Sequence, residues 1–147
     1  MATFMVNVDS EKVKTTVTDR ASSVDRFITE LVLSCNYSNR WPPIIGLDIE
    51  FNDLNDSTKC KPATLQLCSG SRCIIIQLVH MEVKCGGLLD LAVYCGSLEV
   101  EAKPLSVIKG NWGAGNLNME QIESAASDAF TFFRILMASL GALLFEN

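Results

Sequence analysis

The chain has 147 residues, about the size of one domain, and its 48% hydrophobic content supplies enough apolar surface for a single core. Its formal net charge of -5 argues against a basic coat for nucleic acid, so a polyanion would need a local patch or a bound cation. Charged residues near the start interrupt the apolar stretch that a signal peptide needs, and the apolar run 135–145 is too short to span a bilayer. We therefore expect a soluble intracellular protein, in the nucleus or cytoplasm, without membrane association.

The N-terminal quarter predicts a hairpin followed by a helix. Over residues 3–17, apolar positions alternate with others and a β-branched stretch follows a short polar turn, which predicts a half-buried hairpin at a sheet edge. Ser22 with Asp25 is typical of a helix start, and the helix is expected to end near Cys35. Its expected apolar face consists of Val24, Ile28, Leu31 and Val32.

The middle of the chain predicts three adjacent strands. Residues 44–51 are an apolar run with acidic residues near its end, as in a buried central strand whose tip faces a site. A polar loop over 52–61 follows, and the segments 63–68 and 72–78 flank a Ser-Gly-Ser turn, which predicts a hairpin. The six cysteines, without a secretory signal, are expected to be reduced thiols, mostly in the core.

The C-terminal half predicts one long helix after a less regular segment. Residues 88–94 fit a short strand or a helical turn, and the glycine-containing segment 96–115 is expected to be irregular. Asn118 and Gln121 have the spacing of a capping box, which predicts a helix that ends before Gly141. Its expected apolar stripe consists of Ile122, Ala126, Ala129, Phe133, Leu136 and Leu140.

Two acidic residues on the expected strand 44–51 are candidates for metal binding. Asp48 and Glu50 are two residues apart, so on a strand they project to the same face, where two like charges call for a cation or a proton. Asp128, one helical turn after Ser124, is a third candidate ligand. Carboxylate oxygens suit Mg²⁺ or Mn²⁺, which activate water in phosphodiester cleavage. Because such spacings also arise by chance, the spacing alone leaves a purely structural role open.

The motifs around these residues resemble a known family. Ile44–Phe51, Pro62–Cys68 and Cys73–Leu78 resemble the first acidic motif and following hairpin of the plant Werner-syndrome-like exonucleases, in the DEDD 3'-5' exonuclease superfamily. Asn111–Trp112 and the segment 121–130 resemble its closing motif. The resemblance implies an α/β, truncated ribonuclease-H-like fold, a mixed β-sheet with flanking helices, in one domain over residues 1–147.

The same resemblance implies the activity and the site. It implies release of nucleotides from DNA or RNA 3' ends with two Mg²⁺ or Mn²⁺ ions, which Asp48, Glu50 and Asp128 would bind as ligands. In the family a tyrosine that orients the attacking water stands four residues before the last aspartate, whereas this chain has Ser124. Serine also hydrogen-bonds water but is too short to reach the same place.

A second departure from the family lies between about residues 79 and 110. This segment is shortened, and the family's middle acidic motif is absent from it; Asp90 instead resembles a structural part of the family. We therefore expect weak or residual exonuclease activity, with a protein partner or oligomer covering the sheet edge that the loss exposes. The alternative is a non-catalytic remnant of the family that binds nucleic acid or a protein.

Other chemically active residues have ordinary structural interpretations. His80, the only histidine, is expected at a strand boundary rather than as a base, and the spacings of Cys68, Cys73 and Cys85 around it do not suit a zinc site. Both tryptophans, Trp41 and Trp112, are expected to pack on their own domain. Three basic residues are interpreted as too scattered to define a patch: Arg72, Lys109 and Arg134.

Overall fold

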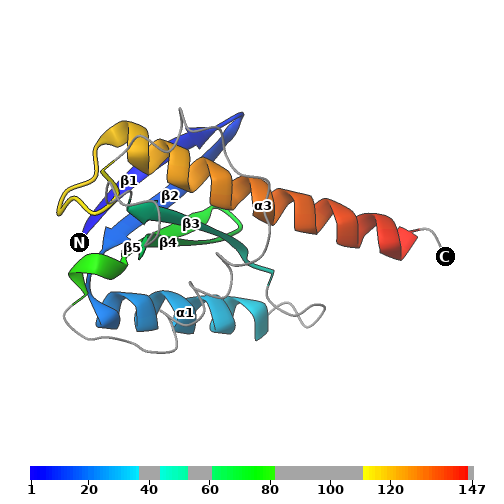
Figure 1. Ribbon diagram of the computed structural model, residues 1–147. Coiled ribbons are helices and arrows are strands. Elements are labelled where there is room, and N and C mark those ends of the chain that lie inside the picture. Colours follow the sequence, from blue (N-terminus) through cyan, green and yellow to red (C-terminus); the bar gives the residue numbers. More distant parts are fainter. Residues whose placement is uncertain (37–43, 53–60, 82–110, 146–147) are drawn as a thin grey trace.

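The computed structural model of the protein describes residues 1–36, 44–52, 61–81 and 111–145. In this part of the chain, a mixed five-stranded sheet lies between two long helices on opposite faces (Figure 1). The elements in chain order are β1 (Ala2–Val8), β2 (Glu11–Thr18), α1 (Ala21–Asn36), β3 (Gly46–Asn52), β4 (Lys61–Ser69), β5 (Arg72–Gln77), the short 3-10 helix η1 (Leu78–His80) and α3 (Met119–Phe145). The α/β class, with a mixed sheet and flanking helices, is therefore confirmed.

The strand order of the sheet is β1-β2-β5-β4-β3. Strands β2 and β5 run parallel, and the other neighbouring pairs run antiparallel. Both expected hairpins are present and have two-residue turns, Asp9-Ser10 and Gly70-Ser71. Asp9 and Gly70 adopt φ angles of 53° and 56°. Glycine enters this left-handed region freely and aspartate tolerates it, so the sequence favours a sharp reversal at both places.

Strand β3 has a different position from the first prediction for residues 44–51. Among the described strands it pairs only with β4, so it lies at the end of the sheet and the prediction of a central strand is wrong there. An edge position agrees with the expectation that the absence of the middle acidic motif exposes an edge of the sheet. Residues 82–110, with the expected segment 88–94, lie outside the described part of the chain.

Successive strand residues face opposite sides of the sheet, so each face has its own core. On the α3 face, the buried residues include Val6, Val13, Cys73, Ile75, Ala126 and Ala129. On the α1 face, they are Val24, Phe27, Leu31, Leu65, Leu67, Ile74 and Ile76. The expected apolar face of α1 is wrong at two positions, because Ile28 and Val32 are exposed and Phe27 is buried in their place.

Helix α3 begins at the predicted capping box and covers one face of the sheet. The Asn118 backbone N–H donates to Gln121 Oε1 (3.0 Å) and the Gln121 N–H donates back to Asn118 Oδ1 (2.9 Å). The apolar stripe is buried as far as Phe130 and partly buried at Phe133, but Leu136 is exposed because this part of α3 extends past the sheet (Figure 1). The predicted end before Gly141 is wrong, and the helix continues to Phe145. In the parts of the chain described above, no helix has the length and apolar character to cross a bilayer.

Candidate metal centre

The two acidic residues of β3 face helix α3. Ile45, Leu47 and Ile49 pack against the core on the α1 face, so the alternate residues Asp48 and Glu50 project from the other face. The cross-strand pairs on β4 are Gln66 for Asp48 and Thr64 for Glu50. Glu50 is only 5% exposed, whereas Asp48 is half-buried.

A close approach of β3 to α3 brings the third acidic residue to this pair. A Cβ atom at Gly46 would overlap the Ala129 carbonyl oxygen and the Phe133 backbone nitrogen, so only glycine permits the observed contact between strand and helix. Asp128 precedes Ala129 on the helix and is half-buried. One carboxylate oxygen from each of Asp48, Glu50 and Asp128 lies within 4.8 Å of the others. Two elements separated by more than sixty residues thus supply one acidic cluster.

The chemistry of this cluster favours a hard divalent cation. Three carboxylates so close together repel one another unless a cation or protons neutralise them, and the burial of Glu50 increases that cost. All the donors are oxygens, which suit Mg²⁺ or Mn²⁺. In the described part of the chain this is the sole group of three or more potential His, Cys, Asp or Glu ligands.

The nearby thiols are poor competitors for such a metal. Cys68 and Cys73 are cross-strand neighbours on the α3 face and both are free and buried. A hydrogen bond with Cys68 raises the pKa of Cys73 well above its usual value; burial and the charges of Cys68 and Asp48 act in the same direction. The neutral thiol therefore dominates at neutral pH, and a protonated thiol is not a metal ligand. The expectation of reduced core cysteines is confirmed for these two residues.

A buried polar pair that was not among the residues predicted from the sequence lies beside the acidic residues. Gln66 and Thr64 are both fully buried, and Gln66 Nε2 donates to Thr64 Oγ1 at 2.7 Å. The other amide atom, Gln66 Oε1, has no hydrogen-bond partner among the described residues. Gln66 is the cross-strand neighbour of Asp48, so this buried amide lies beside the acidic residues of β3. The sequence signal was present, because two polar residues alternate with apolar ones on a buried strand.

The loop before α3 closes one end of the sheet near Glu50. Gln77, in the same cross-strand row as Thr64, donates from Nε2 to the Ala114 and Gly115 carbonyl oxygens, at 3.1 and 3.2 Å. A hydrogen bond of 2.8 Å joins His80 Nε2 and the Gly113 carbonyl oxygen. His80 therefore anchors the loop at the end of β5, as expected for a boundary residue.

Other candidates from the sequence lie at the following places. Trp112 is only 2% exposed and packs in the core of the α3 face, which confirms that it packs on its own domain. Ser124 lies one turn before Asp128 on α3 and is half-buried. Trp41, Cys85 and Asp90 lie outside the described residues.

Comparisons with known proteins bear on the fold. No family model matches the chain, and no curated protein matches it in sequence. Among solved structures, the EXO domain of Nibbler from Aedes aegypti is similar, with a TM-score of 0.56 over 92% of this chain and 89% of that one, at 12% identity. At this identity the likeness concerns the fold. The chain therefore has an α/β, ribonuclease-H-like fold that carries a cluster of three carboxylates.

Proposed function

We propose that the chain is a single 3'-5' exonuclease-like domain that hydrolyses phosphodiester bonds at the 3' ends of DNA or RNA, with weak activity. The observation that carries this proposal is the convergence of Asp48, Glu50 and Asp128 within 4.8 Å. The fold shared with the Nibbler EXO domain supports it. The motifs 44–51 and 62–68 further favour kinship with the plant Werner-syndrome-like group.

The residues of the cluster have distinct roles in this proposal. The carboxylate oxygens of Asp48, Glu50 and Asp128 would hold the Mg²⁺ or Mn²⁺ ions, with Asp48 as the ligand common to both. When bound, such ions supply an activated water and stabilise the leaving oxygen. We assign the buried Gln66, the cross-strand neighbour of Asp48, the role of orienting that carboxylate.

Ser124 limits the expected rate. In the family that the sequence resembles, a tyrosine at this position orients the attacking water. The serine side chain is too short to reach the same place, so we expect slow hydrolysis. The same residue, with the shortened segment 79–110, supports a second candidate function: a non-catalytic domain that binds nucleic acid or a protein. Only the first candidate predicts hydrolysis, and that hydrolysis depends on Asp48.

The test is digestion of a labelled 3'-recessed DNA duplex, and of a labelled RNA strand, with Mg²⁺ or Mn²⁺. Asp48→Asn is expected to lower the rate by at least about 100-fold, the upper end of the effect of changing a residue that merely supports a metal ligand. Asp25→Asn makes the same chemical change on an exposed residue of α1 and is the matched control. Calorimetric titration with Mn²⁺ measures metal binding without turnover.

The outcomes separate the two candidates. Digestion that Asp48→Asn abolishes, together with Mn²⁺ binding that the same variant weakens, supports the exonuclease. Mn²⁺ and oligonucleotide binding without digestion supports the non-catalytic domain. Equal digestion by the native chain and Asp48→Asn would reject a catalytic role for the cluster.

A further inference from the structure

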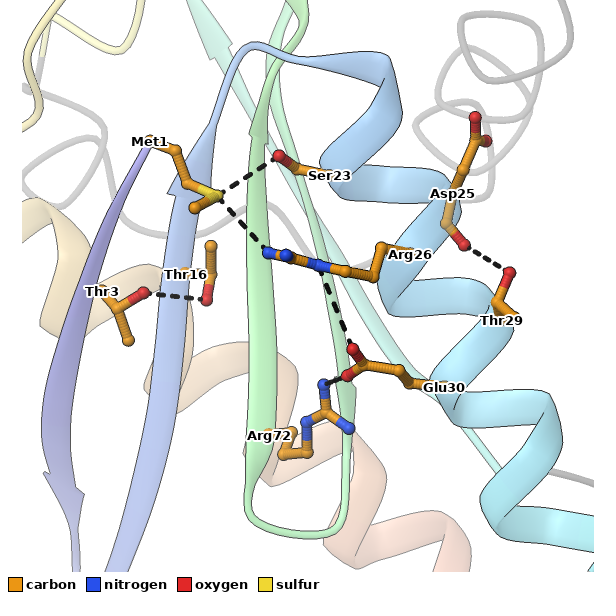
Figure 2. Close-up of polar contacts among 9 residues, drawn as sticks. All are labelled: Met1, Thr3, Thr16, Ser23, Asp25, Arg26, Thr29, Glu30 and Arg72. Carbon is orange, nitrogen blue, oxygen red and sulfur yellow. Dashed lines mark hydrogen bonds and ion pairs between the residues drawn. The ribbon is translucent and has the colours of Figure 1, made fainter.

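A second polar site lies on the opposite face of the sheet from the carboxylate cluster. A cavity of about 280 Å³ opens between helix α1 and the strands β1, β2 and β5. Its floor includes Lys14 and Arg72, which are neighbours across the parallel pair of β2 and β5 and so share one face. Helix α1 contributes Arg26 and Glu30 (Figure 2). The volume is close to the lower end of the roughly 300 to 1,000 Å³ of small-molecule sites.

This cavity has the opposite charge from the chain as a whole. Three of its lining residues are cationic, Lys14, Arg26 and Arg72, against one carboxylate, Glu30, whereas the chain carries a net charge of -5. Arg72 thus has two cations from other elements beside it, Lys14 and Arg26, neither of which belongs to the scattered set of the sequence. Arg134 of that set lies on α3, and Lys109 is outside the described residues. A local excess of positive charge attracts anions even on an acidic protein.

Glu30 serves as an internal counter-anion for two of these cations. Its carboxylate forms ion pairs with Arg72 and with Arg26, the latter at 4.0 Å (Figure 2). The hydrogen bond and charge of Arg72, followed by smaller effects of Arg26 and Lys14, lower the pKa of Glu30 despite some opposing desolvation. Lys14 makes no ion pair with any described residue. The cavity thus contains one ammonium group outside any ion pair with the described residues, and two guanidinium groups that share a single carboxylate.

Two donors in the cavity point to a weak acceptor. Ser23 Oγ donates to the Met1 sulfur at 3.3 Å, and Arg26 Nη2 reaches the same sulfur at 3.8 Å (Figure 2). A thioether is a poor acceptor, so a hydroxyl and a guanidinium converge where an anionic oxygen would form much stronger hydrogen bonds. Thr3 and Thr16 lie 3.4 Å apart by their hydroxyl oxygens, and that pair uses only one of their two protons.

We propose that this cavity binds the phosphate group of a small phosphorylated molecule. Arg26, Arg72 and Lys14 supply the charge, and the hydroxyls of Ser23 and Thr16 supply further donors. Planar guanidinium groups match phosphate oxygens in pairs, and the ammonium adds a point charge. The size of the cavity suits one phosphate with a sugar or a nucleoside. This site is separate from the proposed exonuclease centre and needs no metal ion.

The test is calorimetric titration of the full chain with sodium phosphate and with adenosine 5'-monophosphate, in buffer containing EDTA. Lys14→Gln and Arg26→Gln are each expected to weaken binding about tenfold, the effect of one charge-assisted hydrogen bond at an accessible site. Arg134→Gln removes the same charge from α3, on the other face of the sheet, and is expected to leave binding unchanged. EDTA keeps the carboxylate cluster free of metal, so failure here leaves the proposed exonuclease untouched.

Glu30→Gln gives a result of opposite sign. It releases Arg26 and Arg72 from their shared carboxylate, so phosphate is expected to bind several-fold more tightly, as opposite charges favour binding and like charges oppose it. Loss of packing alone would weaken binding in every variant, so this increase distinguishes a site from a merely structural cluster. Circular dichroism and thermal unfolding verify that each variant is folded.

Three results would overturn the proposal. The first is no binding of phosphate or the nucleotide by the native chain at millimolar concentration. The second is an affinity for phosphate that is the same in the native chain and in Lys14→Gln, Glu30→Gln and Arg134→Gln. The third is binding of a ten-nucleotide thymidine strand, sensitive to Lys14→Gln, when neither small phosphate compound binds; that outcome would assign the cavity to a polymer backbone.

Discussion

The two faces of the sheet differ in how completely a helix covers them. On one face, α3 packs over the strands (Figure 1), and the carboxylate cluster lies at the β3 end, where Asp48 and Glu50 meet Asp128 of the helix. On the other face, α1 packs mainly over β4 and β5, and a cavity with three cations lies beside β1 and β2. Acidic and basic side chains thus occupy opposite faces at opposite ends of one sheet. Successive side chains of a strand face opposite sides of the sheet, which separates the acidic from the basic residues. The position of each helix then determines which of these residues are exposed to solvent.

The largest expected effect comes from disturbing the contact between β3 and α3. Gly46→Ala places a methyl group against the backbone atoms of Ala129 and Phe133. Backbone atoms within a helix cannot move aside as the end of a flexible side chain can. Overpacking of this kind costs about 3 kcal/mol. We expect a loss of this size in the free energy of unfolding, measured by urea denaturation, together with weaker Mn²⁺ binding because Asp128 moves away from β3.

Gly70→Ala is the matched control for that change. Gly70 has no neighbour within 4 Å of an added Cβ, and its φ of 56° makes alanine strained by only about 1 kcal/mol. It lies in the β4–β5 turn, away from α3. Equal losses of stability in the two variants would show that the fit between β3 and α3 is looser than the geometry indicates.

A smaller effect is expected from Gln66→Met, which keeps the side-chain length and removes the buried amide. Because a residue that orients a metal ligand typically contributes 10- to 100-fold in affinity, we expect Mn²⁺ binding to weaken by at least about tenfold. Stability should fall by about 1 kcal/mol, since the variant removes the hydrogen bond to the buried Thr64 hydroxyl together with the Oε1 atom that has no partner among the described residues. Leu65→Met, the adjacent residue on the α1 face, is the control and should leave Mn²⁺ affinity unchanged.

The smallest effect is a dependence of stability on alkaline pH that belongs to the α3 face. Because the pKa of Cys73 is raised in the folded chain, the unfolded thiol ionises first as the pH rises above about 8.5. Its contribution is therefore fully present below that pH and is lost as the pH rises toward the folded pKa. Thermal unfolding at pH 8 and pH 10 should show a smaller decrease for Cys73→Ala than for the native chain.

An acidic counterpart belongs to the α1 face. The pKa of Glu30 is lowered chiefly by Arg72, so its ion pairs stabilise the fold above the ordinary pKa of a glutamate and are lost as the pH falls through the lowered value. Unfolding curves at pH 6 and pH 3 should converge for the native chain and Glu30→Gln at the lower pH. A difference that persists at pH 3 would contradict an electrostatic role.

The sequence was sufficient to predict a feature that lies within a single helix or strand. The spacing of Asp48 and Glu50 defines their common face, and Asn118 with Gln121 forms the predicted cap. It was insufficient where distant elements meet. Lys14, Arg26 and Arg72 come from a strand, a helix and another strand, and nothing in their spacing indicates that β2 pairs in parallel with β5.

The exposed end of α3 illustrates the same limit. Periodicity predicts an apolar stripe through Leu136, but the pattern cannot indicate where the underlying sheet ends. The choice of Phe27 over Ile28 on α1 was equally open, since both positions are apolar and the sheet decides which one it buries.

The parallel pairing of β2 with β5 also sets an order of events during synthesis. The N-terminal hairpin forms from local contacts, but its sheet partner, residues 72–76, leaves the ribosome more than fifty residues later. Until then the apolar residues of β2, such as Val13 and Val17, lack their β5 neighbours, and closing so long a loop is the slow step in forming a sheet of this topology. The nascent hairpin is therefore the segment in which premature pairing with another chain is most expected.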